Sequence, residues 1–170
     1  NLYQSLAEDK ESKDHIIYLP SIDNIALRDK RKTSNILSQE LDYYIYDMKT
    51  GPSLMSLRMS MLDSSEERRI EMKAKIADFQ KVINDSFAMT GKRIEIEGSK
   101  FTVFTDNGTL PVEALSSGEK QILLIMLRVF LLNGNEAIVM IDEPTYSLDI
   151  EWQFKLVTML THLNNKAQYF

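Results

Sequence analysis

The 170-residue chain contains no cysteine and only one tryptophan. Without cysteine, a disulfide scaffold, a zinc ribbon and thiol catalysis are all excluded. A protein that does without disulfide bonds fits a reducing compartment, and we expect a cytoplasmic location.

Long apolar runs are missing as well. The longest, Ile122–Leu132, is interrupted by Arg128 and is much shorter than the roughly 20 residues of a membrane-spanning helix. The first residues, NLYQSLAEDKESKD, contain no apolar segment typical of a secretory signal. The sequence therefore predicts no membrane partner.

The composition is typical of a soluble globular domain. Hydrophobic residues make up 44% of the chain and charged residues 26%, as in folded proteins. Twenty Lys and Arg against 25 Asp and Glu give a net charge of 20 − 25 = −5. This acidic balance argues against a general polyanion binder. The basic run Arg28–Lys32 leaves two interpretations open, a contact with DNA phosphates or a solvated loop.

Patterns in the N-terminal half predict a strand and two helices. Residues 15–19 are typical of a short strand, and residues 34–48 have apolar side chains at helical spacing. Ser64 and Glu67 form a capping-box signature, which predicts a longer helix that ends near Gly91. The charged side of that helix indicates a partly solvated arm or lid. Its apolar face comprises Ile76, Phe79, Ile83 and Phe87.

Strand and helix patterns alternate in the rest of the chain. Two alternating segments around Gly98-Ser99 predict a β-hairpin at residues 93–104. The elements expected after the hairpin are a helix at 117–132, a strand at 137–141, a helix at 150–163 and a strand that begins near Ala167. Such alternation predicts an α/β fold with a parallel sheet.

We divide the chain into two regions on this basis. Residues 1–109 would form a helical lid or arm with a strand and the hairpin, and residues 110–170 the α/β core. The helix expected at 150–163 is amphipathic, and the side chains that we expect it to bury are Ile150, Phe154, Val157, Leu160 and Leu163.

Small polar residues lie at the start of the helix expected at 117–132. The sequence of residues 115–121 there is LSSGEKQ. The first backbone N–H groups of a helix have no partner within the helix, and with the helix dipole they attract anions. Gly118 would let a phosphate approach the backbone closely, so the segment predicts a phosphate contact. An ordinary helix cap by Ser116 or Ser117 is the other interpretation.

Two carboxylates follow the strand expected at 137–141. Asp142 and Glu143 come directly after the apolar run AIVMI, which we expect to be buried on both faces. Ligands bind at this edge of open α/β sheets. A first carboxylate there can hold Mg²⁺ through water, and a second can polarise an attacking water. The alternative is a simple polar turn, which Asp-Glu-Pro also favours.

A third segment, Ser147-Leu-Asp149, precedes the helix expected at 150–163. Taken alone, Asp149 could be no more than the N-cap of that helix. Asp149 lies seven residues beyond Asp142, and the order and spacing of the three segments together are more informative than any one of them.

Together the three segments resemble the C-terminal half of an ABC-type ATPase head, over about residues 112–170. Residues 115–119 (LSSGE) resemble its signature motif, residues 139–143 (VMIDE) its Walker B motif with the catalytic glutamate, and residues 147–149 (SLD) its D-loop. They are most similar to the RecF, SMC and OLD-like ATPases of DNA repair and antiphage defence, including those of Septu-type and retron-linked systems. The resemblance implies a P-loop NTPase-like fold.

This resemblance also implies roles for the acidic residues and partners for the protein. Asp142 would ligate Mg²⁺ through its water shell, and Glu143 would be the general base for the attacking water. Asp149 would couple two ATP sites across a dimer with a second ATPase head. The implied partners are that second head, DNA or RNA, and a nuclease domain or protein.

The signature segment would contact ATP from the opposite head. By resemblance, Ser116 and Gly118 would reach the γ-phosphate of ATP bound to the partner's P-loop, and Ser117 and Glu119 would complete the cofactor-binding set. Ser117 departs from the glycine of the best-known signature, but it is also small.

Two parts of such a head are missing from the sequence. No segment matches G-x-x-x-x-G-K-[ST], the loop that cradles phosphates, and we expect that loop to precede Asn1. The switch histidine is expected beyond Phe170, because His162 lies within a helical pattern and is interpreted as a surface residue. We therefore expect the chain alone to hydrolyse no ATP and the intact protein to be an ATPase.

Two rival classes remain. The chain could be a non-catalytic interaction module or scaffold that lends its signature face to a separate P-loop protein, although a scaffold has no need of the Asp142-Glu143 pair. It could also belong to an ABC transporter cassette, which the lack of membrane-coupling features makes less favoured.

Overall fold

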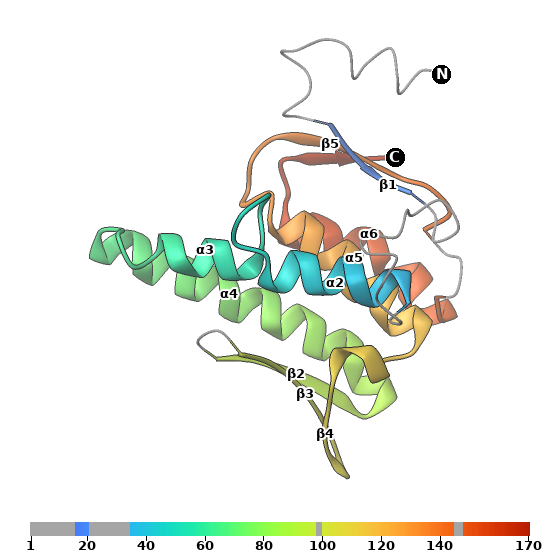
Figure 1. Ribbon diagram of the computed structural model, residues 1–170. Helices are drawn as coiled ribbons and strands as arrows, with labels where there is room; N and C mark the ends of the chain where they lie inside the picture. Colours follow the sequence, from blue (N-terminus) through green and yellow to red (C-terminus); the bar gives the residue numbers. More distant parts are fainter. Residues whose placement is uncertain (1–15, 21–34, 98–99, 145–147) are drawn as a thin grey trace.

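The computed structural model describes residues 16–20, 35–97, 100–144 and 148–170. A small parallel sheet lies at the top of Figure 1, a group of helices lies beneath it, and an antiparallel sheet lies at the bottom. This is the α/β fold that the alternation of patterns predicts.

The parallel sheet contains β1 (Ile16–Leu19), β5 (Ala137–Ile141) and β6 (Ala167–Tyr169), in the order β1-β5-β6. β5 is the central strand of the three, and it pairs in parallel with both neighbours. The expectation that β5 is buried on both faces is wrong for the described residues. Val139 faces the helices and is fully buried, whereas Ile138 points to the other face and is 37% exposed.

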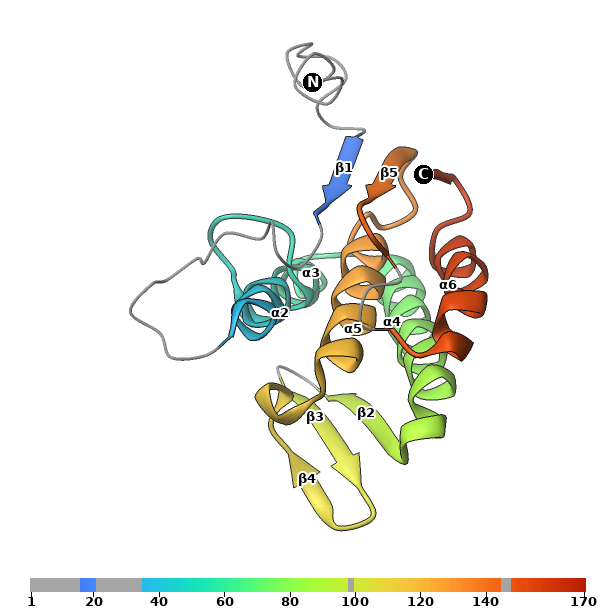
Figure 2. The ribbon, with the colours of Figure 1, turned by 90° about the vertical axis from the view of Figure 1, so that its right-hand side faces the viewer.

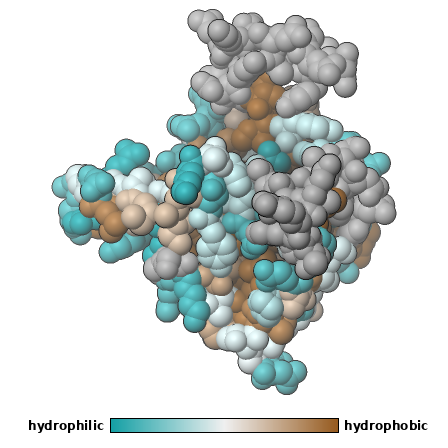
Figure 3. Space-filling model, viewed as in Figure 1, coloured by the Kyte–Doolittle hydropathy of each residue, from teal (hydrophilic) through white to brown (hydrophobic). Residues whose placement is uncertain are grey.

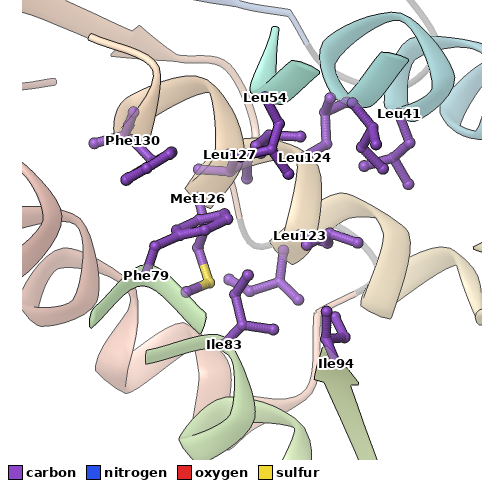
Figure 4. Packing of buried hydrophobic residues seen from close by; sticks show 14 of the residues in the cluster. Leu41, Leu54, Phe79, Ile83, Ile94, Leu123, Leu124, Met126, Leu127 and Phe130 are labelled. Atoms are coloured by element: carbon purple, nitrogen blue, oxygen red, sulfur yellow. The ribbon is translucent and has the colours of Figure 1, made fainter. Parts of the chain in front are cut away.

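Helix α5 (Ser117–Phe130) lies at the centre of the molecule, and 12 of its 14 residues are buried. Helices α2 (Ile36–Tyr46), α4 (Glu66–Phe87) and α6 (Ile150–Leu163) pack against it. Figure 2 shows α5 between α2 and α6, with the parallel sheet above it. In the close view of Figure 4, Phe79 of α4 lies against Phe130 of α5. Their rings stack with centroids 4.3 Å apart.

Helices α3 (Leu54–Ser60) and α4 form an arm that projects to the left in Figure 1. α3 was not predicted, because its seven residues are too few for a periodic pattern. Ser53 begins it through a capping box with Ser56. The predicted cap of α4 is displaced by one position: Ser65, not Ser64, accepts a hydrogen bond from the amide of Arg68.

The antiparallel sheet confirms the predicted hairpin. β2 (Lys92–Glu97) pairs with β3 (Lys100–Thr105), and a third short strand, β4 (Gly108–Leu110), pairs with β3. Two short 3₁₀ helices, η3 (Ala88–Thr90) and η4 (Val112–Ala114), connect this sheet to α4 and α5. Ile94 and Val103 point from the sheet into the core and are fully buried.

The predicted buried face of α6 is largely wrong. Ile150, Phe154 and Val157 are 62%, 81% and 62% exposed. The helix instead buries Trp152, Leu156 and Leu160. The indole Nε1 of Trp152 donates a hydrogen bond of 2.9 Å to the carbonyl oxygen of Ser86, at the end of α4. Trp152 is therefore a packing residue of the core.

The two predicted regions share one hydrophobic core. β1, from residues 1–109, pairs with β5, and α2 and α4 pack against α5. The division at residue 110 stays a prediction about organisation. Within the part of the chain that the structure describes, no helix is both long and apolar enough to span a bilayer.

The corrected face of α6 is tested by two neighbouring substitutions. Leu156→Ala leaves a cavity in the core and should lower the free energy of unfolding by about 2–5 kcal/mol. Val157→Ala removes methyl groups that are exposed to solvent and should change it by less than about 0.5 kcal/mol. Urea unfolding of both variants measures the difference, and equal losses would contradict the assignment.

Candidate functional site

Ser116 is the N-cap of α5. Its Oγ accepts a hydrogen bond of 3.2 Å from the amide of Glu119, and its own amide donates one of 2.8 Å to Glu119 Oε2. The interpretation of this segment as a helix cap is thus confirmed. Ser116 and Ser117 are exposed and Gly118 is buried, so the first turn of α5 presents two small hydroxyl side chains to solvent. A capped helix start of this kind still offers its dipole to an anion.

Glu119 is almost completely buried, with 2% of its surface exposed. Its Oε1 accepts a hydrogen bond of 2.8 Å from Lys92 Nζ at the beginning of β2. Burial opposes ionisation, but hydrogen bonds from Lys92, Ser116 and Thr90 outweigh it and lower the pKa of the Glu119 carboxyl. Oε1 therefore holds the start of α5 to the antiparallel sheet, and Oε2 closes the capping box with Ser116.

Sequence reasoning missed the next two residues of α5, Lys120 and Gln121. Lys120 is 4% exposed, and burial lowers the pKa of its ammonium group against the raising influence of Glu113 and Glu119. The Oε1 of Gln121 is the one buried side-chain oxygen or nitrogen without a hydrogen-bond partner among the described residues. The signal in the sequence was the pair of polar residues at the start of an otherwise apolar helix.

Gln121 lines a cavity of about 50 Å³ that also reaches Asp142. Arg128 of α5 lines the same cavity, and its guanidinium donates a hydrogen bond of 3.1 Å to the carbonyl oxygen of Tyr18. The cavity therefore connects the inner side of α5 with the carboxyl ends of β1 and β5.

Asp142 lies directly after β5, at the carboxyl end of the central strand. Its amide donates a hydrogen bond of 2.9 Å to the carbonyl oxygen of Leu19, which extends the pairing with β1. The hydroxyl of Tyr18 donates one of 3.2 Å to Asp142 Oδ2. This contact was not predicted, and it holds the carboxylate beside the end of the sheet.

Glu143 is exposed and adopts a left-handed backbone conformation, with φ at +48°. This conformation is uncommon for residues other than glycine and asparagine, and it costs free energy. The chain therefore turns at Glu143 and does not continue the direction of β5. Strain of this kind concentrates at functional sites.

Asp149 is the N-cap of α6, which confirms the interpretation of this residue as a helix cap. Its Oδ1 accepts a hydrogen bond of 2.9 Å from the amide of Glu151. Leu148 before it is buried and anchors the segment to the core. Ser147, the first residue of this motif, lies outside the described residues.

The three segments gather on one side of the molecule. The starts of α5 and α6 and the end of β5 lie at the right in Figure 1 and face the viewer in Figure 2. Within the described ranges, no cluster of three or more acidic, His or Cys side chains could hold a metal alone. Asp142 fits Mg²⁺ in another way, because this ion often takes one or two carboxylates together with water and substrate phosphates.

His162 is confirmed as a surface residue of α6, where its Nε2 lies 2.9 Å from Asp78 Oδ2 of α4. The basic run at residues 28–32 lies outside the part of the chain that the structure describes.

A parallel sheet with paired carboxylates after its central strand, packed on a helix with a small, polar start, defines a P-loop NTPase-like α/β domain. The profile of a family described as "AAA domain, putative AbiEii toxin, Type IV TA system" matches residues 7–170. The protein belongs to this family of AAA domains, whose general function is nucleotide binding of the ATPase type. AAA domains of the P-loop class bind ATP with Mg²⁺. A comparison with curated proteins found no match.

The capping box at the start of α5 predicts different effects for two adjacent serines. Ser116→Ala removes the acceptor for the Glu119 amide and should lower the free energy of unfolding by about 1 kcal/mol. Ser117→Ala removes no capping bond and should change it by less than about 0.5 kcal/mol. Urea denaturation followed by circular dichroism measures both, and a larger loss for Ser117→Ala would refute the assignment.

The buried carboxylate predicts a dependence of stability on acid. Folding lowers the pKa of Glu119 from its usual 4.5, so its contribution is complete above that value and is lost as the pH falls through the lowered pKa. Below about pH 5, stability should therefore fall more steeply in the wild type than in Glu119→Gln. Glu97→Gln, at an exposed position of β2, is the control and should keep the wild-type slope. Parallel slopes for Glu119→Gln and the wild type would be evidence against the pair with Lys92.

Proposed function

We propose that this chain is part of an ABC-type ATPase head of the RecF, SMC and OLD-like group. It would supply the signature helix, the Walker B strand and the D-loop of a head that dimerises head-to-tail on ATP. The observation that carries the proposal is the gathering of the α5 start, the Asp142-Glu143 pair and Asp149 on one side of the fold.

The geometry of α5 supports a contact with phosphate. Ser116 and Ser117 are exposed at the helix start. The N-terminus is the positive end of the helix dipole, and the first backbone N–H groups of a helix point outward from it. Glu119 is turned inward to Lys92 and Ser116, so we assign it to holding this end of the helix in place. Ser116, Ser117 and Gly118 would then face the γ-phosphate of ATP bound to the opposite head.

The two carboxylates have different surroundings, which supports different roles. Asp142 is half-buried and accepts a hydrogen bond from Tyr18, so it is oriented as a ligand for the water shell of Mg²⁺. The bound ion would neutralise the charge on the phosphates. Glu143 is exposed and turned away from the strand, where it can accept a proton from an attacking water.

The proposed site is shared between two chains or two heads. The phosphate-cradling sequence G-x-x-x-x-G-K-[ST] does not occur in these 170 residues, so another segment or protein must supply it. Asp149, at the exposed start of α6, would meet the second head across the interface. By resemblance, the intact machine would act on DNA or RNA in repair or antiphage defence, with a nuclease as a further partner.

A scaffold or interaction module is the competing proposal. It predicts no use for the Asp142-Glu143 pair. The unfavourable backbone conformation of Glu143 favours the catalytic proposal, because a scaffold gains nothing from retaining glutamate there.

The test is Glu143→Gln in the intact protein that contains this chain. Loss of the base should reduce ATP hydrolysis by at least about 100-fold while ATP binding persists. The variant should accumulate as an ATP-bound dimer, which light scattering with nucleotide present and absent will show.

Glu97→Gln is the matched control, since it makes the same chemical change at an exposed position of β2. It should retain wild-type hydrolysis. Wild-type turnover in Glu143→Gln would refute the base assignment, and slow turnover without an ATP-dependent dimer would refute the head-to-tail arrangement.

A further inference from the structure

The arm of α3 and α4 carries a pocket far from the candidate nucleotide site. It has a volume of about 550 Å³. Its lining residues are Met55, Arg58, Met59, Met61, Leu62, Glu66, Arg69 and Lys73. Figure 3 shows apolar surface among hydrophilic residues at this end of the arm. The arm therefore presents a methionine-rich hollow rather than a uniformly solvated surface.

The apolar part of the pocket is accessible. Met59 is 48% exposed and Leu62 is 67% exposed, while Met61 is buried at the base. Methionine side chains are flexible and polarisable, which suits them to contacts with varied apolar partners. Exposed apolar surface at a projecting end of a soluble domain indicates an interaction site.

Positive charge surrounds this apolar surface. Arg58, Arg69 and Lys73 line the pocket together with a single carboxylate, Glu66. Glu66 pairs with Arg69. Among the described residues, Arg58 and Lys73 have no ion-pair partner, so the pocket has an excess of positive charge although the whole chain is acidic.

We propose that this pocket binds an amphipathic helix of a partner protein, with apolar side chains on one face and carboxylates beside them. The apolar face would enter the hollow formed by the methionines and Leu62. The carboxylates would meet Arg58 and Lys73. Binding of a helix in an apolar groove by side chains at helical spacing is a recurrent mode of peptide recognition.

The lining argues against single-stranded nucleic acid as the occupant. Proteins that bind single strands stack bases on aromatic side chains, and none of the residues that line this pocket is aromatic. The proposal is independent of nucleotide binding, because the pocket contains none of the residues of the candidate site.

The experiment uses the 170-residue chain and a fluorescent synthetic helix with leucines on one face and glutamates on the others. The wild type should bind it in an anisotropy titration. The double variant Arg58→Glu and Lys73→Glu should bind at least about tenfold more weakly, because two attractive charges become repulsive. The double variant Met59→Ser and Leu62→Ser should show a similar loss through the apolar contact.

Matched controls keep the result specific. Lys49→Glu with Lys81→Glu makes the same charge change at exposed positions outside the pocket. Met48→Ser with Met89→Ser likewise replaces two exposed apolar side chains by serine outside the pocket. Both controls should bind as the wild type does. Circular dichroism will verify that every variant is folded.

Three outcomes would overturn the proposal. They are no binding of the glutamate helix, equal binding of a lysine version of it, and equal effects of the pocket and control variants. Two more would assign the pocket to another occupant and also reject it. In one, the pocket variants abolish binding of a single-stranded oligonucleotide but not of the helix. In the other, they abolish self-association of the chain measured by light scattering.

Discussion

The burial of α5 on nearly every side is the constraint on which the other elements depend. Twelve of its residues are buried, it contacts α2, α4 and α6, and it lies beneath the parallel sheet in Figure 2. At its start, Lys92 and Glu119 attach it to the antiparallel sheet. One helix therefore fixes the position of the polar turn at residues 116–118 relative to the carboxyl end of β5. A rigid helix is a precise support for groups that must act together.

Much of this architecture could be predicted from the sequence. The apolar face of α4, the β-hairpin and the parallel strands follow from local periodicity, and all three are present. Periodicity failed at α6 because that helix carries two apolar stripes. Ile150, Phe154 and Val157 form one stripe, and Trp152, Leu156 and Leu160 form the other. Spacing alone could not decide which stripe faces the core, since the choice depends on the shape of α4 and α5.

The candidate site was predictable to the extent that its residues are adjacent in sequence. Asp142, Glu143 and Asp149 could be singled out because they follow a strand or precede a helix. Tyr18 could not, since its hydrogen bond to Asp142 joins residues 124 positions apart. The pairing of Glu119 with Lys92 was likewise beyond the sequence, because Lys92 lies in β2, 27 positions away along the chain. Ser116 and Asp149 are both N-caps and both have a proposed role in the ATP site. Their capping role is compatible with that proposed role.

The backbone at position 143 also bears on how this protein would respond to selection for stability alone. A residue held at a φ of +48° costs of the order of 1–3 kcal/mol, which glycine largely avoids. Selection for stability alone would thus favour exchange of this glutamate for glycine or asparagine. Stabilisation of the domain guided by backbone conformation alone would select the same exchange, and the resulting variant would gain thermal stability by discarding the carboxylate. Position 143 is therefore one to leave untouched when the domain is engineered for robustness.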